Sequence, residues 1–415
     1  MVLNLVWLGF FLSAFVIALF QLAQGDLEVF SRLQTALFDA AKTGFEISLG
    51  LTGMMALWLG ILRVGEKAGL INAFARAVNP LFRHLFPGVP QGHPAQGAMT
   101  MNMSANMLGL DNAATPLGLK AMQELQSLND KPDTATNAQI LFLVLNTAGL
   151  TLIPTSVIAI RQTIALKQGL TGFNAADIFL PTLVATSISL LSALLIVALV
   201  QRLPLWRPAV WAPLAVFGAA IGGLTWWLAQ LPPEQSARLI GAIGSGVILG
   251  LAVLFLLAGA LRRVNVYETF VDGAKEGFGV AVQIIPYLVA MLCAIAVFRA
   301  SGGMDWIMQG IAAIVTAFGL PTDFLPALPV GLMKILSGSG ARGLMVDVMD
   351  TYGVASFPAQ VAAIIQGSTE TTFYVLAVYF GSVGVKKTRH ALACALFADV
   401  VGIIAAVLVG YAFFR

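Results

Sequence analysis

Charged residues are scarce in this chain of 415 residues. Only 10% of its residues are Asp, Glu, Lys or Arg, whereas 58% are hydrophobic. A soluble domain of this composition would have too few polar side chains to cover its surface. A lipid bilayer removes that requirement, so the composition predicts an integral membrane protein whose first partner is the bilayer itself.

Cysteine and histidine are rarer still, with two and three copies. Cys293 and Cys394 lie inside apolar segments without partner spacing, which is typical of buried small side chains. His84, His93 and His390 form no ligand pattern. We therefore expect neither a metal site nor a cofactor.

Motifs for enzymatic and nucleic-acid chemistry are also lacking. The sequence has no nucleotide-binding loop, serine elbow or zinc motif, and energy from ATP would need another subunit. The net charge is only +3, and the basic residues are scattered between apolar runs. We expect no enzyme activity and no nucleic-acid partner.

Long apolar runs are what the sequence does contain. Each is almost free of charge and continuous rather than alternating, as in helices that cross a hydrocarbon core of about 30 Å. The clearest are 3–20, 47–61, 140–160, 178–200, 211–228, 239–261, 280–297, 361–379 and 391–414. We interpret the first as an uncleaved span, although Ala23-Gln24-Gly25 is similar to a cleavage site.

Basic residues cluster at Arg262-Arg263 and at Lys386-Lys387-Thr388-Arg389. The positive-inside rule favours the cytoplasmic side for both loops. The expected location is therefore the cell (inner, cytoplasmic) membrane, crossed many times.

A short repeat divides the chain. The segment DAAKTGF at Asp39–Phe45 recurs as DGAKEGF at Asp272–Phe278, and a join near residue 205 gives domains 1–205 and 206–415. Five predicted spans, beginning near residues 47, 140, 178, 211 and 239, separate the copies. The count leaves out 67–86, whose charges indicate an interfacial or partly buried helix. An odd number makes the copies inverted, whereas one span more or fewer would make them parallel.

Two segments with polar tips have apolar arms too short to cross a bilayer, at Gly97–Lys120 and Pro326–Asp350. Both predict re-entrant hairpins, whose irregular backbone at membrane depth must be buried or line a watery cavity. The alternative is an ordinary surface loop with Asn and Ser capping helices, and Asp111 with Arg342 would also serve as a structural bridge. The candidate solute-binding residues are Asn102, Asn106, Asn112, Thr115, Ser337, Ser339 and Arg342.

Two apolar spans have polar interruptions, at Asn146–Thr151 and Gln366–Thr372. Such interruptions predict broken helices, whose freed carbonyls and helix ends can bind an ion or substrate. Glu370 is the sharpest signal, because a carboxylate in an apolar span normally faces a cavity or a partner. Its alternative role is as a structural partner of Arg or of helix N-termini. The candidates here are Asn146, Thr147, Gln366, Ser368, Thr369, Glu370 and Thr371.

Three polar residues in the last spans of the two halves are weaker candidates. The Thr186 and Ser187 hydroxyls are most simply packing groups or are bonded to the preceding helical turn. Asp399 is left open between a structural and a functional role.

Two stretches carry a family resemblance. The segment NMSANMLGLDNAATPLGLKAMQEL at Asn102–Leu125 resembles the hallmark of spore maturation protein A. Leu336–Gly353 and Gln366–Leu392 resemble that of spore maturation protein B. Both are assigned to the nucleoside-recognition or gate group, which is similar to the core of concentrative nucleoside transporters and of B-type ferrous-iron transporters. The resemblance implies two inverted gate-type repeats, each with a hairpin and a broken helix. Residue types at the tips differ, so nucleoside specificity is not carried over.

These observations predict an all-α polytopic membrane protein with about nine to eleven transmembrane helices. We expect a secondary transporter or channel-like carrier of a small polar solute or ion, with a coupling cation as a further candidate partner. The alternative is an envelope or spore-maturation assembly scaffold. Either function is compatible with a homo-oligomer.

Overall fold

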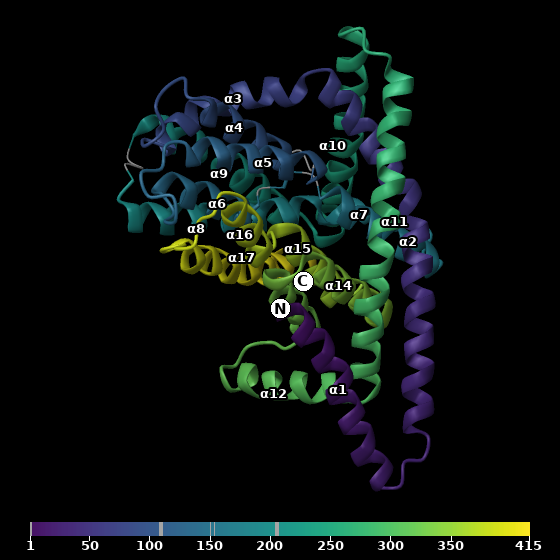
Figure 1. Cartoon of the computed structure of the whole chain (residues 1–415). Helices are drawn as coiled ribbons and strands as arrows, with labels where there is room; N and C mark the ends of the chain where they lie inside the picture. The colour runs from purple at the N-terminus through teal and green to yellow at the C-terminus, as the bar shows by residue number, and fades with distance from the viewer. Residues whose placement is uncertain (1, 108–110, 150, 153, 204–206) are drawn as a thin grey trace. The chain divides into compact units, whose positions relative to one another are not determined.

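The computed structural model describes residues 2–107, 111–149, 151–152, 154–203 and 207–415. Helices account for most of this part of the chain, which confirms the all-α class (Figure 1). They are α1 (Val2–Ala23), α2 (Val29–Lys67), α3 (Leu70–Leu85), α4 (Pro94–Met107), α5 (Asp111–Gln126), α6 (Asn137–Ala148), α7 (Thr155–Lys167), η1 (Ala175–Ile178), α8 (Phe179–Gln201), α9 (Pro208–Ala229), α10 (Pro233–Leu261), α11 (Val266–Ala300), α12 (Gly303–Ala317), η2 (Leu325–Ala327), α13 (Leu328–Leu336), α14 (Gly338–Tyr352), α15 (Phe357–Ser368), α16 (Thr372–Ser382) and α17 (Ala391–Phe414).

Eight helical segments of the described chain are long and apolar enough to cross a membrane. They match eight of the nine predicted runs. The ninth, 140–160, is divided between α6 and α7, each too short to cross alone. The protein is therefore a multi-pass membrane protein.

The predicted repeat extends well beyond seven residues. Each copy has a long helix, a shorter helix, a helical hairpin, a broken helix and a closing helix. The first copy is α2, α3, α4–α5, α6–α7 and α8; the second is α11, α12, α13–α14, α15–α16 and α17. Helices α9 and α10 connect the two copies.

The chain forms two compact units, each built from segments of both halves. Unit 1 contains 1–57, 156–175 and 275–366, and unit 2 contains 58–155, 176–274 and 367–415. Each broken helix has one half in each unit, since the breaks lie next to the unit boundaries. The division into domains 1–205 and 206–415 concerns sequence resemblance and stays a prediction.

Inside unit 1, α2 and α11 pack antiparallel through glycines. A Cβ atom on Gly44 would lie 3.1 Å from Val289 Cγ2, and one on Gly277 would lie 2.6 Å from Met55 O. Residue numbers thus rise along α2 as they fall along α11. Both glycines belong to the seven-residue repeat, and small residues allow such close helix packing. Because α2 and α11 are corresponding elements, this packing gives the two copies opposite orientations.

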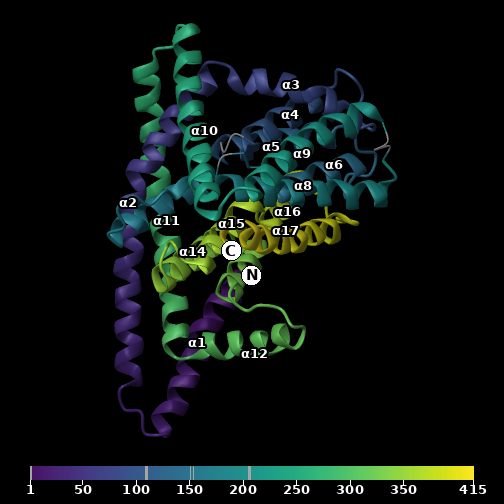
Figure 2. The same ribbon diagram turned by 180° about the vertical axis from the view of Figure 1, so that it is seen from behind.

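Unit 2 is held by an apolar core between both closing helices and the first hairpin. Helices α8 and α17 lie side by side, and α6 packs against both (Figures 1 and 2). Met99, Met122, Phe142 and Ala395 are almost fully buried members of this core. The core positions α6 and α16, the two helices that end and begin at the breaks.

Candidate functional site

The first break begins where α6 ends. Thr136 starts α6 with a capping box, in which its hydroxyl accepts from the Gln139 N–H and the Gln139 side chain accepts from the Thr136 N–H. Gly149 ends the helix at φ 40°, in the left-handed region that favours glycine. Pro154 precedes α7 and has no N–H with which to continue a helix.

The second break crosses the first inside unit 2. Thr371 has an extended backbone before α16, and the Glu370 N–H donates to the Thr147 carbonyl at 2.9 Å. A Cβ atom at Gly149 would lie 2.7 Å from Glu370 Cγ. The Glu370 side chain therefore packs directly over the glycine that ends α6.

A side chain of α8 and the backbone at the end of α4 border this crossing. The Thr186 hydroxyl donates to the Gly149 carbonyl at 2.7 Å, and the Leu152 N–H donates to Met107 O at the end of α4. Ser187, by contrast, donates to Leu183 in its own helix, as predicted. Back-bonding is therefore confirmed for Ser187, whereas the buried Thr186 hydroxyl bonds to the carbonyl at the first break.

An amide and phenol network joins the first hairpin to α6 and α16. Asn106 donates to Asn146 Oδ1 at 2.8 Å, and the Tyr379 hydroxyl approaches the same oxygen at 3.4 Å. Asn102 donates to Ala114 O at 2.8 Å and to the Tyr379 hydroxyl at 3.2 Å. Three predicted asparagines are thus brought together with a tyrosine.

Sequence reasoning missed Tyr379. Its ring stacks on Phe142 at 5.9 Å between centroids, and Gly118 leaves the space that its hydroxyl fills. The available signal was a tyrosine in a mostly apolar helix, a feature that Tyr379 shares with Tyr374.

Asp399 has a hydrogen-bond partner at the second break. Thr372, the first residue of α16, donates to Asp399 Oδ2 at 2.7 Å, and both side chains are buried. Asp399 thereby fixes the start of α16 from the closing helix α17. This contact gives Asp399 a structural role beside the break.

Asn102 Oδ1, in the amide and phenol network, and Thr182 Oγ1 are buried polar atoms of unit 2 without a hydrogen-bond partner among the described residues. Thr182 lies against Gly367 at the second break, where a Cβ atom would be 2.7 Å from Thr182 Cγ2. Buried polar groups normally find partners, so these atoms are candidates for contact with a polar solute.

The predicted residues divide between the two units. Unit 2 contains Asn102, Asn106, Asn112, Thr115, Asn146, Thr147, Ser368, Thr369, Glu370 and Thr371, whereas unit 1 contains Ser337, Ser339, Arg342 and Gln366. The side chains of Asp111 and Asn112, and tip residues 108–110, lie outside the described part of the chain. The proposed bridge between Asp111 and Arg342 stays a prediction.

The second hairpin has helical arms α13 and α14 that pack together. Ser337 separates them and caps α14, accepting from the Gly340 N–H at 3.1 Å. Its hydroxyl also lies 3.2 Å from that of Ser339. Capping is thus one role of this serine, as the alternative interpretation of the tip allowed.

The crossing offers a mixed set of ligands. The Glu370 carboxylate, the Asn102 amide oxygen and the Thr182 hydroxyl are acceptors that suit a cation or a hydroxyl- or amine-bearing solute. No group of three or more His, Cys, Asp or Glu residues suitable for a metal exists in the described chain. The arrangement therefore suits hydrogen bonding and a single ionic contact.

Comparison with known proteins agrees with this architecture. The family model described as Gate, nucleoside recognition, matches residues 48–163 and 281–386, together more than half of the chain. The two matched segments run from α2 through α7 and from α11 through the end of α16, which are corresponding parts of the repeats.

Relatives match each part. The chain is 46% identical to spore maturation protein B of Bacillus subtilis (strain 168) over 154 residues, covering 37% of this chain and 85% of that protein. It is 38% identical to spore maturation protein A of the same organism over 193 residues, covering 46% and 92%. Inner membrane protein YjiG of Escherichia coli (strain K12) is 31% identical over 87 residues, covering 21% and 55%.

A solved structure was also matched. The crystal structure of the Alcanivorax borkumensis YdaH transporter aligns with a TM-score of 0.43 and 16% identity, over 93% of this chain and 89% of that one. On the family model and the two spore maturation proteins, the chain belongs to the Gate, or nucleoside recognition, family, with parts similar to spore maturation proteins A and B.

Proposed function

We propose that this protein is a secondary transporter, or channel-like carrier, that binds a small polar solute or ion where the two breaks cross in unit 2. The observation that carries the proposal is the contact of Glu370 with Thr147 and Gly149, which brings both interruptions to one place. Broken helices that meet beside a carboxylate are a recurrent means of binding ions and solutes in inverted-repeat transporters.

Inverted repeats also supply a mechanism. Two copies of one structure in opposite orientations can exchange their conformations, so that a site between broken helices opens first to one side and then to the other. The breaks between α6 and α7 and between α15 and α16 are the natural hinges, because each interrupts a helix. We place the carrier in the cytoplasmic membrane, in keeping with the name of the relative YjiG.

The test is ligand binding by the purified, detergent-solubilised full chain. A thermal-shift panel contains nucleosides, nucleobases, metal ions, amino acids and small carboxylates, and Glu370→Gln is run in parallel. At about 100 times its Kd, a ligand of the native state stabilises it by about 2.7 kcal/mol. We expect a saturable shift that Glu370→Gln abolishes.

Glu268→Gln is the matched control, since Glu268 is exposed at the start of α11. It should leave the shift unchanged. A shift equal in wild type and Glu370→Gln would exclude the crossing as the binding site. Uptake by proteoliposomes of the stabilising compound then tests transport itself.

An assembly role is the second candidate, and the names of the two spore maturation relatives favour it. A scaffold should lose partner binding rather than solute binding when its surface is changed. Normal uptake in a variant that no longer copurifies with envelope partners would favour transport, whereas the absence of any ligand or uptake would favour assembly.

A further inference from the structure

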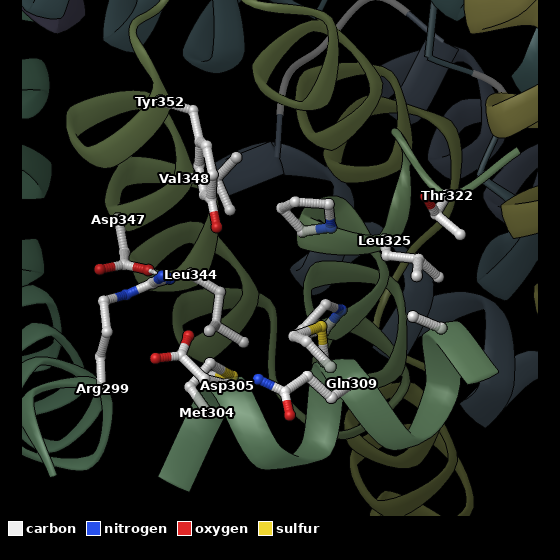
Figure 3. A pocket seen from close by; sticks show the side chains of 14 residues that line it. Arg299, Met304, Asp305, Gln309, Thr322, Leu325, Leu344, Asp347, Val348 and Tyr352 are labelled. Atoms are coloured by element: carbon white, nitrogen blue, oxygen red, sulfur yellow. Dashed lines mark hydrogen bonds and ion pairs between the residues drawn. The ribbon is translucent and has the colours of Figure 1, made fainter. Parts of the chain in front are cut away.

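Unit 1 contains a pocket that the proposed function does not use. Its volume is about 240 Å³, and it is lined from α11, α12, the η2–α13 segment and α14. Arg299, Asp305 and Asp347 lie on one side in Figure 3, and Thr322 and Leu325 lie on the other. Charged and apolar side chains thus line one cavity together.

Charge in the pocket is unbalanced. Arg299 and Asp347 form an ion pair, and the Arg299 guanidinium also lies 5.9 Å from the centre of the Tyr352 ring. The Asp347 carboxylate is thus neutralised by Arg299, the one cationic side chain in the described pocket lining. Asp305 supplies a second carboxylate, so the described pocket lining carries one negative charge in excess.

The remaining lining decides what kind of cation fits. The lining also includes the apolar side chains of Leu325, Pro326, Pro329 and Val348, and Met304 and Met308 add thioethers from α12. Such a surface suits an apolar body and leaves a bare metal ion short of oxygen ligands. A carboxylate beside an apolar wall is the complement of a small organic ammonium.

The pocket is reachable from water. The Gln21 amide donates to Ser301 O at 3.0 Å, so the α11–α12 turn lies level with the end of α1, which is a candidate membrane span. Asp305 is exposed and follows that turn by four residues. The pocket therefore opens near one edge of the membrane.

We propose that this pocket binds a small organic ammonium ion with an apolar body, held through its nitrogen by the Asp305 carboxylate. The site is separate from the crossing of the breaks. Its occupant would contact α11, α12 and α14 of the second repeat together.

The experiment measures binding of phenethylamine to the purified full chain at pH 7 by calorimetry or thermal shift. The neutral phenethyl alcohol and the anionic phenylacetate are the ligand controls. We expect saturable binding of the amine alone, weakened at least about tenfold by Asp305→Asn, because a charge-assisted hydrogen bond is lost. Asp305 is exposed, so this variant should fold normally.

Asp39→Asn is the matched variant, since Asp39 is exposed in α2 of the same unit and does not line the pocket. It removes the same charge and should leave amine binding unchanged. Absence of amine binding, equal binding of the alcohol, or an equal loss in both variants would each overturn the proposal.

Discussion

Gly149 and Glu370 show how single residues shape the proposed binding site. Glycine at 149 allows the left-handed backbone that stops α6, and its missing side chain leaves room for Glu370. The Glu370 carboxylate thereby reaches the crossing while the Glu370 backbone N–H keeps its hydrogen bond to the Thr147 carbonyl. One glycine therefore ends a helix and positions an acid.

Gly149→Ala should impair both properties. The positive φ costs about 1–2 kcal/mol of unfolding free energy, and the new methyl group pushes Glu370 away. We expect a lower melting temperature and a loss of ligand shift. Gly169→Ala has a positive φ with open space around it, so it should lower stability alone. Equal ligand binding in both variants would contradict this view of Gly149.

Asp133 is a residue outside the membrane that joins two loops of unit 2. Its carboxylate accepts from the Thr134 hydroxyl at 2.7 Å and lies 3.3 Å from Lys387 Nζ. The hydrogen bond from Thr134, followed by Lys387, holds the pKa of Asp133 below its ordinary value of 3.8. Its backbone carbonyl accepts from the Lys386 and Lys387 N–H groups.

A lowered folded-state pKa means that the stabilisation is complete above pH 3.8 and is lost as acid titrates the carboxylate below that value. We expect the Lys386 and Lys387 amides to exchange faster, relative to their intrinsic rates, when the pH falls from about 6 to about 3. Asp133→Asn should remove this pH dependence, whereas Asp130→Asn should retain it. Hydrogen exchange with mass spectrometry measures both, and an unchanged profile in Asp133→Asn would refute the assignment.

At the scale of elements, antiparallel packing of α2 on α11 decides the relation of the repeats. The glycine of the seven-residue motif has the same packing role in both copies, since Gly44 packs against α11 and Gly277 packs against α2. The motif is thus explained by helix packing rather than by ligand binding.

Gly277→Ala should destabilise this packing, because the added Cβ would lie 2.7 Å from Ala56 Cα, a backbone atom. Overpacking of this kind costs about 1–3 kcal/mol of unfolding free energy. Gly279→Ala, two residues further along the same helix, has nothing within 4 Å and should be neutral or slightly stabilising. Thermal unfolding in detergent compares them, and equal melting temperatures would argue against the close contact.

At the scale of the molecule, contacts between loops check the number of membrane crossings. In unit 2, Thr134 pairs with Lys387, and the chain between them crosses six times when each broken helix counts once. In unit 1, Lys167 lies 3.1 Å from Asp350, after four crossings. An even number of crossings returns the chain to the same side of the membrane. The two residues of each contact must lie on one side, so both counts agree with the contacts.

This topology predicts two classes of exposed position. Single cysteines are introduced at Ser127, Lys386, Gln24 and Thr171 after Cys293 and Cys394 are replaced by alanine. With an impermeant maleimide on whole cells, Gln24→Cys and Thr171→Cys should react alike, and Ser127→Cys and Lys386→Cys should form the opposite class. The positive-inside rule places the Lys386 class in the cytoplasm. Mixed labelling within a class would refute the count.

Composition and local pattern by themselves determined the class of this protein. Continuous charge-free runs predict helices in lipid, since barrel strands would alternate apolar and polar residues. The breaks after α6 and before α16 follow from Gly149, Pro154 and the polar residues around Glu370. The number of spans followed as well, with the runs 140–160 and 361–379 each divided into two helices, α6 with α7 and α15 with α16. Such features depend on neighbours along the chain, so the sequence reveals them.

Only the tertiary structure decided which of these features meet. The two breaks cross at Glu370 and Thr147, Tyr379 joins three asparagines, and Thr186 bonds to a break instead of its own helix. The second hairpin belongs to another compact unit. These contacts join residues tens to hundreds of positions apart, and packing between helices, which no local pattern encodes, selects them.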